Sequence, residues 1–163
     1  PSEVRHELSV LGVLRKIDTP SVLFFLGILL AVASLQSMGQ LSDLAAALDN
    51  RIGTNTEAGV YGVNIIIGLL SSIVDNVPLV AAAMGMYEVT ATGLFMVDGV
   101  FWEFLAYCAG TGGSALIIGS AAGVAIMGLE KIPFGWYIKN ISLLALVGYF
   151  AGAGVYILQR MIF

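Results

Sequence analysis

The sequence predicts an all-α integral membrane fold, in which transmembrane helices are combined with a re-entrant helical hairpin and a discontinuous helix whose middle is unwound. Charged residues make up only 11% of the 163 residues, and hydrophobic residues make up 58%. Ordinary soluble domains are about 25% charged, so too few polar residues are present to cover a soluble surface, and lipid is expected to cover much of the chain. Uncharged segments alternate with short polar ones, and two of the apolar segments are interrupted in the middle.

The first third of the chain predicts one membrane crossing between two surface segments. Residues 1–19 alternate Glu, Arg and Lys with Leu and Val, which is typical of an amphipathic helix on a membrane surface, here the cytoplasmic one. Residues 20–38 carry no charge and, at about 1.5 Å per residue, can span the hydrocarbon core of about 30 Å as a transmembrane helix. Residues 39–58 contain Asp, Asn and Arg between leucines at helical spacing, so an extracytoplasmic interfacial segment is predicted.

The last apolar segment, residues 133–160, predicts another continuous transmembrane helix. Trp136 and Tyr137 near its start and Tyr156 near its end fit aromatic belts at the two interfaces. The basic residues orient the chain, because an excess of Lys and Arg marks the cytoplasmic side. With the first segment inside, the cytoplasmic basic residues are Arg5, Arg15, Lys16, Lys131 and Lys139, and the external ones are Arg51 and Arg160.

The segment 59–87 predicts a re-entrant hairpin rather than one spanning helix. Two apolar arms, each short for a full span, flank the polar sequence SSIVDNVP at residues 71–78. Non-helical backbone at membrane depth is tolerated only where it faces protein or a wet cavity. A carboxylate there is costly unless it is paired, protonated or bound to a cation. Asp75 is therefore predicted to hold a proton or a hard cation, although a plain turn at the water interface is the alternative.

Residues with neutral side-chain oxygens lie close to Asp75 in the sequence. The side chains of Ser71, Ser72 and Asn76 can replace part of the hydration shell of Na⁺, as can carbonyl groups freed by Pro78. A metal site for transported Na⁺ is therefore predicted at the hairpin tip.

Residues 99–128 predict a discontinuous transmembrane helix. Glycines interrupt it at Gly110–Ser114 and again at Gly119–Gly123, and each costs about 1 kcal/mol relative to Ala in a helix. An unwound stretch near Thr111–Ser114 would present carbonyls and the hydroxyls of Thr111 and Ser114 to a cavity. Tight helix packing through small residues is the alternative. A phosphate-binding loop is excluded, because no Lys follows and no strand precedes.

Other residues limit the function classes. Glu103 is a candidate second proton site, which could equally reach the interface or pair with a segment outside this chain. The single Cys108 excludes an internal disulfide and a multi-Cys metal site. The chain has no Lys/Arg cluster for nucleic acid and no nucleophile–base pair for covalent catalysis, so we expect neither nucleic-acid binding nor enzyme activity, and no cofactor.

The strings SSIVDNVPLVAAAMGMY and FWEFLAYCAGTGGSALIIGSAAGVAIMGLEKIPFGWYIK closely resemble NhaD-type Na⁺/H⁺ antiporters of the ion-transporter superfamily. The resemblance covers essentially the whole chain and is most specific over residues 71–140. It implies that the chain is the C-terminal half of such a protein and one repeat of an inverted-repeat transporter. It also implies that Ser71, Asp75, Asn76, Thr111 and Ser114 occupy ion-site positions.

The function expected from this sequence is secondary active antiport of Na⁺ or Li⁺ against H⁺. Na⁺ and H⁺ would compete at the hairpin-tip carboxylate, and alternating access would carry the loaded site between the two sides. One alternative is a Na⁺-coupled dicarboxylate or arsenite permease of the same superfamily, although an anion carrier is expected to keep neutral residues at the hairpin tip. A second alternative is a membrane scaffold subunit that transports nothing.

The expected partners are the lipid bilayer, the missing N-terminal half of the transporter and a second copy in a homodimer. The expected location is the bacterial inner membrane, as a multi-pass protein. The chain begins with Pro1 rather than Met, so we expect it to be part of a longer protein.

Overall fold

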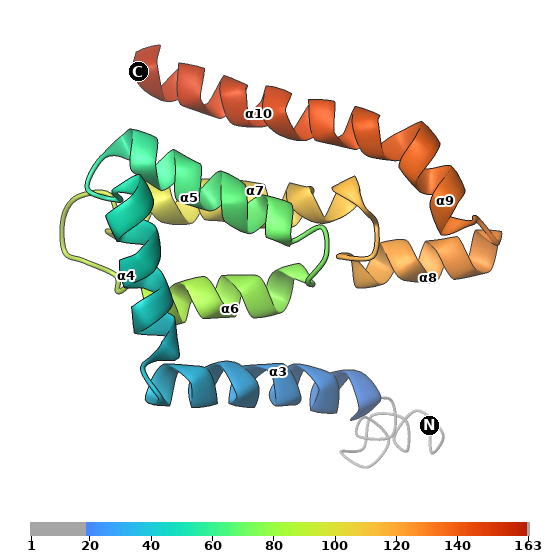
Figure 1. Ribbon diagram of the computed structural model, residues 1–163, viewed down its shortest axis with the longest axis horizontal. Helices are drawn as coiled ribbons and strands as arrows, with labels where there is room; N and C mark the ends of the chain where they lie inside the picture. Colours follow the sequence, from blue (N-terminus) through green and yellow to red (C-terminus); the bar gives the residue numbers. More distant parts are fainter. Residues whose placement is uncertain (1–18, 163) are drawn as a thin grey trace, which may run out of the picture.

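The computed structural model describes residues 19–162, which fold into packed helices with one isolated bridge between Thr90 and Met96. The predicted segment 1–19 lies outside the described residues apart from Thr19. The helices are α3 (Thr19–Ser37), α4 (Gln40–Ile52), α5 (Glu57–Leu70), α6 (Asn76–Met86), α7 (Val100–Gly112), the 3₁₀ turn η1 (Gly113–Ala115), α8 (Ala121–Glu130), α9 (Phe134–Tyr137), the π-helix η2 (Ile138–Ser142) and α10 (Leu143–Ile162) (Figure 1). The assignment of these helices to membrane-spanning, interfacial and re-entrant segments stays a prediction.

Local signals explain where the hairpin helices begin. The Thr56 hydroxyl accepts a hydrogen bond from the Gly59 N–H at 3.2 Å and caps α5. The Asp75 carboxylate accepts one from the Val77 N–H at 3.4 Å and caps α6. Both are preferred N-cap residues. Between the two helices the chain turns over residues 71–75, where the sequence predicts the hairpin tip.

The hairpin arms extend along only part of the molecule. Figure 1 shows α5 and α6 side by side, with their connecting turn partway along the long axis, whereas the run from α9 to α10 extends over most of it. That run, Phe134–Ile162, is 29 residues long with a mean hydropathy of 2.0, and by length and composition it can cross a membrane. The helix α3 has 19 residues without a charge. Long helices therefore flank a short hairpin.

The core forms where α5 packs against α7. Phe101 and Phe104 are fully buried there, and the ring of Tyr61 meets Phe104 edge-on at 5.2 Å between centroids. At the far end of the same contact, Gly68 and Gly112 bring the two backbones so close that neither position has room for a Cβ atom. Small residues permit this approach in membrane helices, so the alternative interpretation of the glycines as packing residues holds for Gly112.

The discontinuous helix is broken later than the predicted position. The helix α7 continues through Gly112, tightens into η1, and the non-helical stretch is residues 116–120, where Ile117 has a φ of 60°. The prediction of an unwound stretch at Thr111–Ser114 was therefore wrong by several residues. The hydroxyls of Thr111 and Ser114 bond to carbonyls one turn earlier, Tyr107 at 2.7 Å and Thr111 at 2.6 Å, and this local bonding is compatible with a helix.

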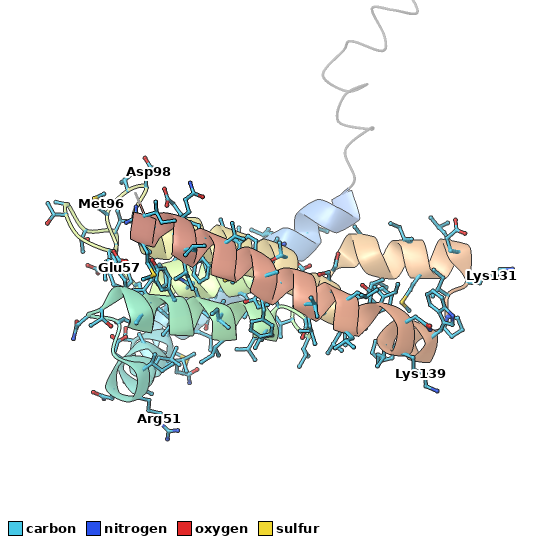
Figure 2. The ribbon with its side chains drawn as sticks, turned by 90° about the horizontal axis from the view of Figure 1, so that it is seen from above. Arg51, Glu57, Met96, Asp98, Lys131 and Lys139 are labelled. Atoms are coloured by element: carbon cyan, nitrogen blue, oxygen red, sulfur yellow. The ribbon has the colours of Figure 1, made fainter. Side chains whose placement is uncertain are left out.

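Several charged side chains lie toward the two ends of the molecule. Figure 2 shows Lys131 and Lys139 at the end opposite Arg51, Glu57 and Asp98. Long helices with apolar middles and charged ends suit a chain that crosses a bilayer along this axis.

Candidate ion-binding site

The hairpin turn and the break after α7 touch each other through their backbones. A Cβ atom on Gly119 would collide with the carbonyl of Ser71 and with the backbone of Ser72, and a Cβ atom on Gly113 would lie 3.5 Å from the Ser71 carbonyl oxygen. Only glycine at position 119 allows this approach. The two interrupted elements that the sequence singles out separately are therefore one structural unit.

A cavity of about 200 Å³ lies beside this contact. Asn76 comes from the start of α6, Ser114 from η1, Ser120 from the break and Tyr137 from α9, and backbone of Gly110, Gly113 and Gly119 completes much of the wall. Three helix ends meet at this cavity: the N-terminus of α6 at Asn76, the N-terminus of α8 at its N-cap Ser120, and the C-terminal end of α7, which η1 continues. Helix N-termini carry partial positive charge and C-termini partial negative charge, so this cavity can interact with ions.

The Ser71 side chain joins the hairpin to the broken helix. It is fully buried, and its hydroxyl donates a hydrogen bond to the Ala109 carbonyl at 2.9 Å. Ala109 itself lines the cavity. The oxygen of Ser71 keeps lone pairs that can accept further bonds, so Ser71 lies in the unit that borders the cavity.

The remaining hairpin-tip residues are spread around the turn. The buried Ser72 donates its hydroxyl to the Leu69 carbonyl, 2.7 Å away within its own turn. Asp75 is partly exposed at the start of α6 and does not line the cavity, whereas the next residue, Asn76, does. The structure thus brings Asn76 to the cavity directly and keeps the Asp75 carboxylate one residue away, at the helix N-terminus.

The two hydroxyls of the second element also differ in position. Ser114 lines the cavity, but Thr111 is exposed and does not. Of the predicted site residues, Asn76 and Ser114 therefore meet at the cavity, Ser71 contacts its wall, and Ser72, Asp75 and Thr111 lie outside the wall.

Glu103 lies in the first turn of α7, remote from the cavity. Its carboxylate accepts a hydrogen bond from the Tyr156 hydroxyl of α10 at 2.8 Å. Nearby on the same end, Arg160 approaches Glu57 at 3.8 Å, with both side chains about half exposed. The partner of Glu103 is thus within this chain.

Sequence reasoning missed two polar side chains at the cavity, those of Ser120 and Tyr137, and one buried amide, that of Asn64. The Ser120 hydroxyl accepts from the Gly123 N–H at 3.2 Å, and a serine ahead of a helical segment is an N-cap signal. The sequence predicts Tyr137 in the aromatic belt, and no local pattern indicates that it lines the cavity. Asn64 is fully buried and donates to the Phe101 carbonyl at 3.1 Å, and within residues 19–162 its Oδ1 atom has no hydrogen-bond partner.

The donor set of the cavity is made of neutral oxygens. Over the part of the chain that the structure describes, no three His, Cys, Asp or Glu side chains come together to hold a metal ion. Hydroxyl, amide and carbonyl oxygens suit hard cations rather than the softer transition metals. The lining of the cavity can therefore offer neutral oxygen ligands to a hard cation.

Comparison with known proteins agrees with a transporter. The protein family described as citrate transporter matches residues 4–103. Sodium/proton antiporter 1 of Arabidopsis thaliana is 51% identical over 94% of this chain and 25% of its own length. Sodium/proton antiporter 2 of the same plant is 46% identical over 94% of this chain and 34% of its own length. The Na⁺/H⁺ antiporter NhaD of Vibrio cholerae is 38% identical over 66% of this chain and 20% of its own length.

The chain thus spans about a quarter of the length of one plant relative and about a third of the length of the other. No solved structure matches it. The family match and the relatives agree with the membrane character of the helices and with the resemblance carried by residues 71–140. The chain belongs to the citrate transporter family and is a membrane-protein relative of the NhaD-type and plant Na⁺/H⁺ antiporters.

Proposed function

We propose that this chain is part of a secondary transporter that exchanges Na⁺ or Li⁺ for H⁺, and that it supplies one hairpin and one broken helix of the ion site. The observation that carries the proposal is the contact between the hairpin turn at Ser71 and the break at Gly119, beside a cavity lined by Asn76 and Ser114. The antiporter names of relatives from a plant and from bacteria support the same activity.

The lengths of the helices support a re-entrant hairpin. At about 1.5 Å per residue, the 14 residues of α5 extend about 21 Å, which is less than a hydrocarbon core of about 30 Å. The hairpin turn lies partway along the axis that the run from α9 to α10 follows (Figure 1). A turn at membrane depth is tolerated where it lines a cavity, and broken helices form the binding sites of many transporters.

Within this proposal, Na⁺ binds between the two breaks. Asn76 and Ser114 offer neutral oxygens at the cavity, and Ser71 offers one at its wall. Ser72 and Thr111 lie outside the wall and join the site in this proposal only if their hydroxyls turn toward it, and Asp75 supplies the negative charge. In the present structure Asp75 is one residue from the cavity, so cation binding requires the carboxylate to turn toward Asn76. The partial negative charge where the α7 run ends adds to the attraction for a cation.

Antiport follows from competition at one carboxylate. A protonated Asp75 cannot balance the charge of Na⁺, and a carboxylate that holds Na⁺ has no place for a proton. Alternating access then moves either the loaded or the protonated site across the membrane. The activity is transport and not enzymatic catalysis. Glu103, which Tyr156 holds at the other end of α7, is proposed only as a second proton site.

The rest of the transporter completes the site in this proposal. We expect a second hairpin and further acidic residues from the missing N-terminal half, since binding sites of this type form between two repeats. Lipid covers the outer helices, and a homodimer is the proposed assembly. The bacterial inner membrane stays a prediction, because the relatives come from a plant as well as from bacteria.

A Na⁺-coupled anion permease is the second candidate function. It is favoured by the family description, citrate transporter, and by the N-termini of α6 and α8 at the same cavity, which attract anions. Asp75 argues against it. Its carboxylate occupies the N-terminus of α6, where its negative charge offsets the partial positive charge that would attract a carboxylate substrate.

Transport by the full-length protein separates these functions. In everted vesicles with an imposed pH gradient, Na⁺ is expected to release protons and citrate alone is not. Asp75→Asn should abolish the Na⁺ response, because Asn keeps an oxygen but cannot titrate. Asp98→Asn is the matched control, since Asp98 is an exposed acid at the distant end of the molecule (Figure 2). Citrate uptake driven by Na⁺ would favour the permease instead, and no response to either solute would favour a scaffold subunit.

A further inference from the structure

The last helical run reaches the cavity through one side chain. Tyr137 lines the cavity, and its hydroxyl donates a hydrogen bond to the Ser114 carbonyl at 2.7 Å. Between positions 133 and 144 all residues are exposed except Tyr137, Ile141 and Ser142. These three residues therefore mark the face with which η2 and the start of α10 pack against η1.

The helix that carries this face is not a regular α-helix. It is a π-helix over Ile138–Ser142, a wider turn that is rare and occurs frequently at functional sites. Ser142 is buried with 6% of its surface exposed, and within the described part of the chain its hydroxyl has no hydrogen-bond partner. A buried hydroxyl without a partner costs free energy. The π-helix η2 thus holds this unsatisfied buried hydroxyl and also contacts η1, the element that carries Ser114.

The Ser114 carbonyl lies in the last turn before the break, where carbonyl groups lack donors within their own helix. Tyr137 supplies a donor to this carbonyl and so restricts its direction at the edge of the cavity. The phenol oxygen keeps acceptor capacity of its own. Both oxygens are then held in a defined geometry where a cation would bind, and the rigidity of such oxygens influences which ion a site prefers.

We propose that Tyr137 is a positioning residue of the cation site, which acts through the Ser114 carbonyl and sets the affinity for Na⁺ and the preference between Na⁺ and Li⁺. The inference rests on the proposed antiport function. It adds the last helix to a site otherwise built from the hairpin and the broken helix. A purely structural tether between helices would instead affect protein amount or stability while leaving ion preference unchanged.

The test compares two tyrosine hydroxyls. Each donates a hydrogen bond to a backbone carbonyl and so links the region of α7 and η1 to the run from α9 to α10. Tyr137→Phe removes the bond to Ser114 at the cavity, and Tyr107→Phe removes the bond from Tyr107 to the Tyr149 carbonyl at 2.9 Å, away from it. In the full-length transporter, the half-saturating concentrations of Na⁺ and Li⁺ and the maximal rates are measured in everted vesicles, with Asp75→Asn as the inactive reference. Tyr137→para-aminophenylalanine restores a donor at the same ring position.

We expect Tyr137→Phe to raise the half-saturating Na⁺ concentration roughly three- to tenfold, to change the Na⁺/Li⁺ ratio, and to leave the maximal rate within about twofold. Tyr107→Phe should leave the ratio unchanged, and para-aminophenylalanine should recover most of the affinity.

Equal changes in both Phe variants, or none in either, would overturn the inference while the loss in Asp75→Asn upholds the proposed function. If Tyr137→Phe does not accumulate, the para-aminophenylalanine variant decides alone, because its amine donates to the Ser114 carbonyl with a different bond length from the hydroxyl. A shifted Na⁺/Li⁺ ratio at a normal protein amount supports the inference, and a wild-type ratio opposes it. A wild-type protein without a Na⁺ response would overturn both proposals.

Discussion

The hydroxyl of Ser71 donates to the carbonyl of Ala109 across 2.9 Å, and this buried bond joins the end of α5 to the last full turn of α7. The two residues are 38 positions apart, so the bond forms only when the hairpin has docked against the broken helix. It therefore links the stability of the fold to the geometry of the candidate site.

Removal of this hydroxyl should destabilise the protein. Ser71→Ala leaves the buried Ala109 carbonyl without its donor, which typically costs about 1–3 kcal/mol. We expect a lower thermal unfolding midpoint in detergent and a weaker apparent affinity for Na⁺. Ser72→Ala is the control, because the Ser72 hydroxyl donates within its own turn, to the Leu69 carbonyl, and its loss should have a smaller effect on both quantities. Equal midpoints for the two variants would contradict the role of Ser71 as a link.

The close approach of Gly68 and Gly112 makes a second prediction. Gly112→Ala forces a Cβ atom into the backbone of Gly68, and overpacking of this kind costs typically about 1–3 kcal/mol. Gly110→Ala lies two residues earlier in the same helix, where, within residues 19–162 and apart from the neighbouring backbone of α7 itself, no atom lies within 4 Å of the added Cβ atom. It should be neutral or stabilising by up to about 1 kcal/mol, because Ala favours a helix over Gly. Unfolding midpoints of the two variants in detergent test the difference, and a Gly112→Ala variant as stable as Gly110→Ala would show that the contact is loose.

Water access to the hairpin turn provides a third prediction. In a background with Cys108→Ala, Asp75→Cys should react with a membrane-impermeant thiol reagent, because Asp75 is partly exposed beside the cavity contact. Leu144→Cys should not react, although Leu144 is 68% exposed, because lipid is expected to cover that apolar face of α10. Rapid labelling of Leu144→Cys would contradict the bilayer placement of α10, and an unreactive Asp75→Cys would contradict an aqueous path to the turn.

The hairpin was the part of the fold most open to prediction from the sequence. Asp75, Asn76 and Pro78 form a turn signal inside an otherwise apolar segment, and the turn falls at residues 71–75. The position of the second break could not be read in the same way. Glycine lowers helix propensity wherever it occurs, but Gly112 serves close packing and Gly119 serves the contact with Ser71. Those roles depend on a partner helix that local sequence does not reveal.

The composition of the site was predictable only for the residues near the two breaks. Asn76 and Ser114 reach the cavity, as expected for polar residues beside interruptions. Tyr137 reaches it from α9, which begins at Phe134, well after η1 begins at Gly113, and which leads into the π-helix η2, and no periodicity in the sequence indicates this arrangement. Its place in the site follows from tertiary packing alone.

The most direct test of the central claim is the pH dependence of the apparent Na⁺ affinity of the full-length transporter. If Na⁺ and one proton compete for Asp75, protons occupy a growing fraction of the sites as the pH falls. Once most empty sites are protonated, the half-saturating Na⁺ concentration should rise by up to about tenfold for each further unit of pH decrease. The maximal rate at saturating Na⁺ should then change little, and Asn76→Ala should raise the half-saturating concentration at every pH while keeping the slope. A half-saturating Na⁺ concentration that is constant with pH, with only the maximal rate varying, would contradict competition at a shared carboxylate and with it the assignment of this hairpin as the ion site.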